Sequence, residues 1–171
     1  MASLKVEIEQ QRPFASAEEE AFLNLLRSSD CLQREFHRQT RGFGVTSTQY
    51  NVLRILRGAG EQGLTCAAIG RRMIAAEPDI TRLLSRLKKQ GLVRQRRDAK
   101  DRRVVWTGIT EAGLELLRAM DPTIERIPGQ MLGHMDPADL AELNRLLVVA
   151  RSRLSAEPAP ECEGSLEDRE Q

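Results

Sequence analysis

The chain has 171 residues, of which 40% are apolar and 30% charged, and its formal net charge is +1. These values are typical of a soluble protein with one domain, or one domain with extensions. They exclude a membrane-spanning helical protein, because no apolar run approaches the roughly 20 residues that a bilayer requires. The first residues lack the apolar stretch of a secretory signal, so a cytoplasmic protein is expected.

The charged residues are unevenly distributed along the chain. Residues 1–69 carry 8 basic and 8 acidic side chains, residues 70–103 carry 12 and 4, and residues 104–171 carry 6 and 13. The three segments therefore have net charges of 0, +8 and −7. A local excess of positive charge is typical of a surface that binds phosphates, although a charged run alone usually marks only a solvated surface.

The first part of the chain predicts a polar arm followed by a helix. Residues 1–15 have no hydrophobic periodicity and predict a flexible N-terminal arm. Ser16 and Glu19 have the spacing of a capping box, in which each side chain accepts a hydrogen bond from the other residue's backbone N–H. Apolar residues at helical spacing follow to about Arg38, and Gly42 ends the pattern.

Two shorter helices are expected next, joined by a turn rich in glycine. Thr46 and Gln49 form a second capping box, and apolar residues continue from there to the glycines within residues 58–63. Thr65 has the position of an N-cap for a helix that reaches about Met73. This second helix, followed by a turn at Ile74 to Ala76, predicts the first helix of a helix-turn-helix.

The following segment predicts a helix and a β-hairpin. Pro78 suits the first position of a helix because it lacks a backbone N–H, and Gly91 suits the residue just beyond its end. Residues 92–96 and 103–109 are short strand candidates, the second rich in β-branched and aromatic side chains. The polar residues 97–102 between them form the expected loop.

The last part predicts two helices and a tail. Thr110 caps a long helix, which Pro122 and Pro128 are expected to kink or interrupt. Asp136 caps a final helix whose leucines recur every three or four residues, a pattern typical of helix–helix contact. The acidic, proline-containing residues 156–171 predict a disordered tail, which we call the acidic tail.

The helix that starts near Pro78 has two chemically different faces. One face is apolar and is expected to be buried: Ile80, Leu83, Leu84 and Leu87. The opposite face and its flanks are polar and basic: Pro78, Thr81, Arg82, Ser85, Arg86 and Lys89. Arg82 and Arg86 can fork onto guanine edges in a major groove, and the two hydroxyl side chains suit a base edge or a phosphate. The alternative is an ordinary amphipathic surface helix, because such helices are common.

The expected hairpin loop and its flanks are densely basic. The cations are Arg96, Arg97, Lys100, Arg102 and Arg103. Like charges at this density repel one another unless a polyanion binds them, and a short hairpin can place a cation in the minor groove. Asp101 lies two residues before Arg103, so its carboxylate can hold that guanidinium in place. The alternative is a solvated hairpin whose exposed ion pair contributes little.

Four stretches of the chain carry a family resemblance. They are VTSTQYNVLRIL (45–56), GLT (63–65), PDITRLLSRLKKQGLVRQ (78–95) and DRRVVWTGITEAG (101–113). With them the chain, from about Glu19 to Leu154, resembles the MarR family of winged helix-turn-helix transcriptional regulators. The D-x-R of the loop, followed by a strand and T-x-x-G, is the most specific part. One departure is Ala68-Ile69-Gly70, where family members often have E-L-A.

The resemblance implies a mostly α fold with a small β-hairpin wing, and dimerisation helices at both ends of the chain. Residues 46–109 are then the DNA-binding domain, and residues 16–45 and 110–155 form the dimerisation region. In this family pattern Arg103 is the minor-groove arginine and Asp101 its partner. Effector-binding residues differ among members, so none is carried over.

These observations together predict a sequence-specific transcriptional regulator. We expect it to bind double-stranded DNA as a homodimer on a palindromic operator, with recognition helices roughly 34 Å apart. A repressor released by a small aromatic or acidic effector is the preferred hypothesis. We expect no cofactor, no metal and no membrane partner.

The sequence leaves three alternatives. A redox-sensing regulator of the same fold would use Cys31 or Cys66, but a lone helical cysteine is usually a small buried hydrophobe, and Cys162 lies in the acidic tail. An enzyme is disfavoured, because His37 and His134 are the only histidines and no catalytic set or phosphate-binding loop is present. A winged-helix protein that binds only other proteins is disfavoured by the basic segment.

Overall fold

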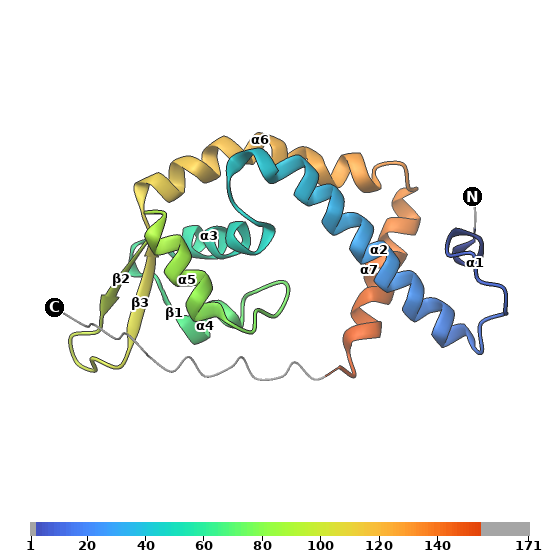
Figure 1. Cartoon of the computed structure of the whole chain (residues 1–171), viewed down its shortest axis with the longest axis horizontal. Helices are drawn as coiled ribbons and strands as arrows, with labels where there is room; N and C mark the ends of the chain where they lie inside the picture. The colour runs from blue at the N-terminus through green and yellow to red at the C-terminus, as the bar shows by residue number, and fades with distance from the viewer. Residues whose placement is uncertain (1–2, 155–171) are drawn as a thin grey trace. The chain divides into compact units, whose positions relative to one another are not determined.

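A computed structural model of the chain describes residues 3–154 (Figure 1). The chain divides into two compact units, Met1–Gln39 and Thr40–Gln171. The acidic tail predicted for residues 156–171 lies outside the described residues. None of the helices described between residues 3 and 154 has the length and apolar character needed to cross a bilayer.

The first unit contains helix α1 (Leu4–Glu7) and nearly all of helix α2 (Ala17–Thr40). The Ser16 hydroxyl accepts the Glu19 backbone N–H at 3.2 Å, as the capping box predicts, but the Glu19 carboxylate accepts the Ala15 N–H instead of that of Ser16. The polar sequence of the arm does not predict α1, in which Leu4 is buried.

The second unit begins with the 3-10 helix η1 (Arg41–Phe43) and helix α3 (Ser47–Ala59). The capping box of α3 is confirmed: Thr46 Oγ1 accepts the Gln49 N–H at 3.2 Å, and Gln49 Oε1 accepts the Thr46 N–H at 2.9 Å. Along α3, Val52, Leu53 and Leu56 are completely buried. This helix is therefore the centre of the core.

A three-stranded antiparallel sheet follows, in the order β1-β3-β2. The strands are β1 (Leu64–Thr65), β2 (Val93–Arg97) and β3 (Val105–Ile109), so the two predicted strands are confirmed with ends displaced by one or two residues. The 3-10 helix η2 (Gly60–Gln62) leads into β1. Two residues are too few to show strand periodicity, which is why β1 was not predicted.

The two helices of the helix-turn-helix are both shorter than the sequence predicts. Helix α4 (Cys66–Gly70) ends before Met73, and helix α5 (Ile80–Lys89) starts two residues after Pro78. The prediction that Pro78 occupies the first helical position is wrong. Asp79 is the N-cap instead, and its carboxylate accepts the Arg82 backbone N–H at 2.9 Å.

Helices α6 (Glu111–Leu132) and α7 (Pro137–Arg151) complete the chain. α6 continues through Pro122 and Pro128, so the predicted interruption does not occur. The Thr110 hydroxyl accepts the Gly113 N–H at 3.2 Å and donates to the Gly91 carbonyl at 2.7 Å. The predicted N-cap of α7 is confirmed, because Asp136 Oδ1 accepts the Ala138 N–H at 2.8 Å.

The core of the second unit lies between α3 and the elements around it. α3 packs against β3, α4 and α6, and α5 packs against β2 and α4. Figure 1 shows the hairpin of β2 and β3 extending beyond α5. One terminal guanidinium nitrogen of Arg57 on α3 donates to both carboxylate oxygens of Asp121 on α6, at 2.8 and 3.0 Å, and this ion pair is partly buried. The arrangement is a winged helix-turn-helix, as predicted.

Candidate nucleic-acid interface

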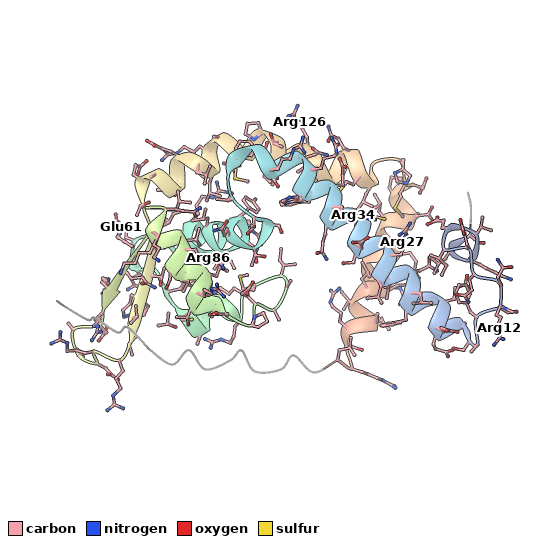
Figure 2. The ribbon with its side chains drawn as sticks, viewed as in Figure 1. Arg12, Arg27, Arg34, Glu61, Arg86 and Arg126 are labelled. Atoms are coloured by element: carbon pink, nitrogen blue, oxygen red, sulfur yellow. The ribbon has the colours of Figure 1, made fainter. Side chains whose placement is uncertain are left out.

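Helix α5 presents the polar face that the sequence predicts. Its apolar residues Ile80, Leu83, Leu84 and Leu87 are all at most 7% exposed. The predicted reading residues are all exposed: Pro78 before the helix, and Thr81, Arg82, Ser85, Arg86 and Lys89 along it. Figure 2 shows Arg86 on this helix. Burial of one face therefore fixes which side chains point outward.

Both ends of α5 are held by hydrogen bonds. Gly91 has a positive φ of 73°, its N–H donates to the Lys88 carbonyl at 2.9 Å, and the Leu92 N–H donates to the Leu87 carbonyl at 3.0 Å. This is the Schellman arrangement, which favours glycine because a side chain would be strained there. Before the helix, Asn51 of α3 accepts the Ile74 backbone N–H at 3.0 Å. These contacts close the C-terminal end of α5 and hold the turn that precedes it against α3.

The loop between β2 and β3, residues 98–104, which we call the wing loop, is organised around Asp98. The sequence did not identify Asp98 as a structural residue. One carboxylate oxygen accepts the backbone N–H groups of Lys100 and Asp101 at 2.9 and 3.1 Å, and the other accepts the indole N–H of Trp106 at 3.0 Å. These hydrogen bonds, the two from the backbone first, hold the pKa of Asp98 below its ordinary value of 3.8. An Asp at the start of a hairpin loop, where its side chain can accept backbone N–H groups two and three residues further on, is the signal that could have identified it.

Asp101 and Arg103 lie in the wing loop and not on a strand, because β3 begins only at Val105. Asp101 Oδ1 accepts the backbone N–H of Arg103 at 3.0 Å. Among the ion pairs of the described residues, none joins these two side chains. The Asp101 carboxylate thus fixes the backbone of Arg103, and the guanidinium is exposed.

The remaining predicted wing residues share this exposure. Arg97 is the last residue of β2 and pairs with Val105 across the hairpin. Lys100 and Arg102 lie in the loop beyond it. All the wing residues predicted to contact DNA are exposed: Arg97, Lys100, Asp101, Arg102 and Arg103. The end of β2 and the loop after it therefore present four cations and the Asp101 carboxylate to the solvent.

A groove of about 320 Å³ runs beside the polar face of α5, and no pattern in the sequence predicts it. It is lined by Thr46 and Thr48 at the start of α3, Glu77 and Asp79 before α5, and Arg82, Leu83 and Arg86 along α5. The two arginines predicted from the helical wheel thus share one concave surface with hydroxyl groups of another helix. Only the three-dimensional fold brings these segments together.

The cysteines named in the redox alternative are in different surroundings. Cys31 on α2 is a free, exposed cysteine whose sulfur lies 3.6 Å from the Arg34 guanidinium. The Cys66 sulfur lies 4.0 Å from the hydroxyl oxygen of Thr81. Neither arrangement specifically supports a redox sensor.

The fold and its exposed basic surface define the chain as a winged helix-turn-helix protein. A model of the MarR family matches residues 43–104. A crystallised MarR transcription factor from Planctomyces limnophilus is 36% identical, and the match covers 80% of this chain and 99% of that one with a TM-score of 0.62. The chain therefore belongs to the MarR family.

Two further relatives agree with this assignment. Sco3205, a MarR family transcriptional regulator from Streptomyces coelicolor, has the same fold, with a TM-score of 0.75, 20% identity, and coverage of 88% of this chain and 98% of that one. The HTH-type transcriptional regulator MhqR of Bacillus subtilis is 29% identical over 101 residues, which are 59% of this chain and 68% of MhqR. Both of these relatives are transcriptional regulators.

Proposed function

We propose that this protein is a homodimeric, sequence-specific regulator that binds palindromic double-stranded DNA and represses transcription until a small effector releases it. The observation that carries the proposal is the polar face of α5, which is exposed while the apolar face is buried. The proposed DNA contacts are Pro78, Thr81, Arg82, Ser85, Arg86, Lys89, Arg97, Lys100, Asp101, Arg102 and Arg103. Sco3205 was crystallised in complex with DNA, which supports the same use of this fold.

The two parts of the interface have different tasks. Arg82 and Arg86 read base edges in the major groove, because a guanidinium can donate two hydrogen bonds to guanine. Arg103 enters the minor groove, where negative potential is strongest at narrow sites. Asp101 acts through the Arg103 backbone, which it holds at the tip of the wing.

Exposed apolar side chains support the homodimer. On α2, Phe22, Leu25 and Leu26 are 59%, 42% and 53% exposed. On α7, where no described residue is buried, Val148 and Val149 are 59% and 56% exposed. Apolar residues at this density favour contact with another protein surface. A two-fold dimer formed by these helices would carry two copies of α5, as a palindromic operator requires.

Relatives support a small-molecule effector. One structural neighbour is Bordetella bronchiseptica BpsR, whose structure concerns regulation of DNA binding by 6-hydroxynicotinic acid. Another is the organohalide-sensing regulator RdhR, which was crystallised with 2,4-dichlorophenol. We infer an aromatic or acidic effector of the same general size. Release of the protein from DNA by a panel of phenols and aromatic acids would identify it.

Fluorescence anisotropy on the DNA flanking its own gene, and on palindromes selected from random duplexes, tests DNA binding. We expect binding to one palindrome that is at least 1,000-fold tighter than to unrelated duplex and that weakens steeply with salt. Arg103→Ala should weaken it, whereas Arg126→Ala on α6 should not. Absence of salt-dependent binding to every duplex would refute the proposal.

The dimer and the repression are tested separately. Sedimentation should give twice the chain mass, and Val149→Asp on α7 should shift the protein towards the monomer. A reporter gene behind the selected operator should be silenced by the wild-type protein. A monomer at micromolar concentration would contradict the dimer, and activation of the reporter would contradict the repressor.

A further inference from the structure

The sheet of the wing has a second face that the proposed DNA contacts do not use. In the β2–β3 register Arg94 lies opposite Gly108, and Arg96 lies opposite Trp106. The residues that alternate with them, Val93, Thr107 and Ile109, are buried in the core. Because side chains alternate across a sheet, both arginines project from the opposite, outer face.

The two guanidinium groups on the outer face are supported by their neighbours. The Arg96 guanidinium carbon lies 5.7 Å from the centre of the Trp106 ring, and one of its N–H groups donates to the Gln62 carbonyl at 3.4 Å. Arg94 covers Gly108, where an added Cβ would lie 3.6 Å from the Arg94 Nε. Gly108 is therefore buried beneath the Arg94 side chain, although it lies on the outer face of the sheet.

Within the part of the chain that the structure describes, no carboxylate forms an ion pair with the two arginines of this face. Neither Arg94 nor Arg96 takes part in any ion pair between residues 3 and 154. Asp98 lies near Arg96, but its oxygens already accept two backbone N–H groups and the indole N–H of Trp106. The outer face thus offers planar, exposed donors to an anionic ligand that the described residues do not supply.

We propose that the outer face of the β2–β3 hairpin binds the acidic tail of the same chain, residues 156–171. The tail carries six carboxylates and one arginine, a net charge of −5. The segment 70–103, which contains Arg94 and Arg96, carries a net charge of +8. Carboxylates pair with a planar guanidinium through two parallel hydrogen bonds, which makes glutamate-rich peptide a fitting ligand for this face.

The chain is long enough for this contact. The 17 residues after Leu154 span at most about 60 Å when extended. Helices α6 and α7, which separate β3 from that point, are about 33 and 22 Å long. If α6 and α7 were placed end to end, their combined length would be about equal to that of the extended segment. A turn joins the two helices, so the distance that the segment must cross is shorter than that combined length (Figure 1). A tethered ligand also has an effective concentration in the millimolar range, well above that of a free acidic protein.

The contact places negative charge directly beside the wing. A seated tail therefore reduces the positive potential of the wing and weakens its attraction for phosphates. The surface does not depend on the proposed operator, because it can be occupied in the absence of DNA. A failure of DNA binding and a failure of this contact are consequently distinguishable.

Trp106 is the only tryptophan of the chain and lies within the proposed surface, so it reports occupancy directly. The test uses the full-length protein without DNA, and a variant in which the six tail carboxylates are replaced by amides: Glu157→Gln, Glu161→Gln, Glu163→Gln, Glu167→Gln, Asp168→Asn and Glu170→Gln. In wild type, the indole N–H resonance and the fluorescence of Trp106 should shift as salt rises from 20 mM to 1 M. In the amide variant the same titration should produce little change.

A synthetic peptide of residues 156–171 tests the surface itself. Added to the amide variant at low salt, it should shift the Trp106 signals in a saturable manner. Arg94→Ala should weaken this binding at least tenfold without disturbing Trp106 directly. Arg126→Ala removes an exposed arginine of α6 (Figure 2) and should leave peptide binding unchanged. Circular dichroism of each variant checks that the fold is retained.

Two results would overturn the proposal. Absence of any peptide-dependent change at low salt would mean that the surface does not accept the tail. Peptide binding that survives Arg94→Ala and is lost in an Arg82→Ala, Arg86→Ala double variant would place the tail on the reading face of α5 instead.

Discussion

Gly63→Ala is expected to destabilise the protein, because this glycine is close to the sheet of the wing. Gly63 has a φ of +70°, and a Cβ added there would lie 2.3 Å from the Thr107 carbonyl oxygen. That oxygen belongs to the central strand, where Thr107 pairs with Leu64, so it cannot move without separating β1 from β3. A side chain at positive φ costs about 1–2 kcal/mol. Weakened strand pairing adds about 1 kcal/mol for each hydrogen bond lost.

The expected loss is therefore about 3 kcal/mol, which corresponds to roughly 6–12 °C in Tm for a chain of this length. Urea unfolding followed by circular dichroism measures it. Gly58→Ala is the matched control, because Gly58 lies inside α3 with nothing within 4 Å of its added Cβ. That change should stabilise the helix by about 0.5–1 kcal/mol. If Gly63→Ala were as stable as wild type, the close approach to β3 would be refuted.

Three further outcomes are expected. Arg103→Ala should weaken operator binding about tenfold or more and lower the salt dependence by about one counterion, as anisotropy at several salt concentrations would measure; unchanged affinity would contradict its role in the wing. A double-mutant cycle on Arg57 and Asp121 should give a coupling of about 0.5–1 kcal/mol, because one Arg57 nitrogen donates to both carboxylate oxygens but the side chains are 37% and 33% exposed; a coupling of zero would mean that the pair does not hold α3 to α6. Because the pKa of Asp98 is depressed in the folded protein, its contribution to stability is complete above its ordinary value of 3.8 and is lost as the pH falls through the depressed pKa; Trp106 fluorescence should therefore stay constant down to about pH 4 and change below it.

Local signals in the sequence predicted most of the helical fold. Hydrophobic spacing and capping residues determine a helix start from a few neighbouring side chains, so Thr46, Thr65, Thr110 and Asp136 were all identified as N-caps. The same reasoning fails where two neighbouring residues could each begin the helix. Pro78 and Asp79 are both good start residues, and the structure uses Asp79 because its carboxylate satisfies the Arg82 N–H.

The candidate site was only partly predictable for a different reason. The outward residues of α5 follow from its own periodicity, because burying the four apolar side chains determines where the polar ones lie. The groove beside them is lined by α3, the turn before α5 and α5 itself. No pattern within any one of these segments indicates that they lie close together. Likewise, β1 depends entirely on its partner strand and has no periodicity of its own.

Prolines inside α6 illustrate how context limits a local rule. Pro122 and Pro128 were expected to kink or interrupt the helix, yet α6 is continuous from Glu111 to Leu132. Packing of α6 against α3, and the buried side chains of Leu117, Met120 and Ile127, stabilise the helix along its length. Tertiary contacts therefore outweigh the loss of two backbone hydrogen bonds.

The Thr110 hydroxyl links two helices that point in different directions. It receives a hydrogen bond from the first turn of α6 and donates one to the Gly91 carbonyl at the end of α5, while the Thr110 N–H donates to the Leu92 carbonyl. These hydrogen bonds consequently hold the start of α6 against the end of α5. We therefore expect a rotation of α6 to be transmitted to the C-terminal end of α5 through Thr110.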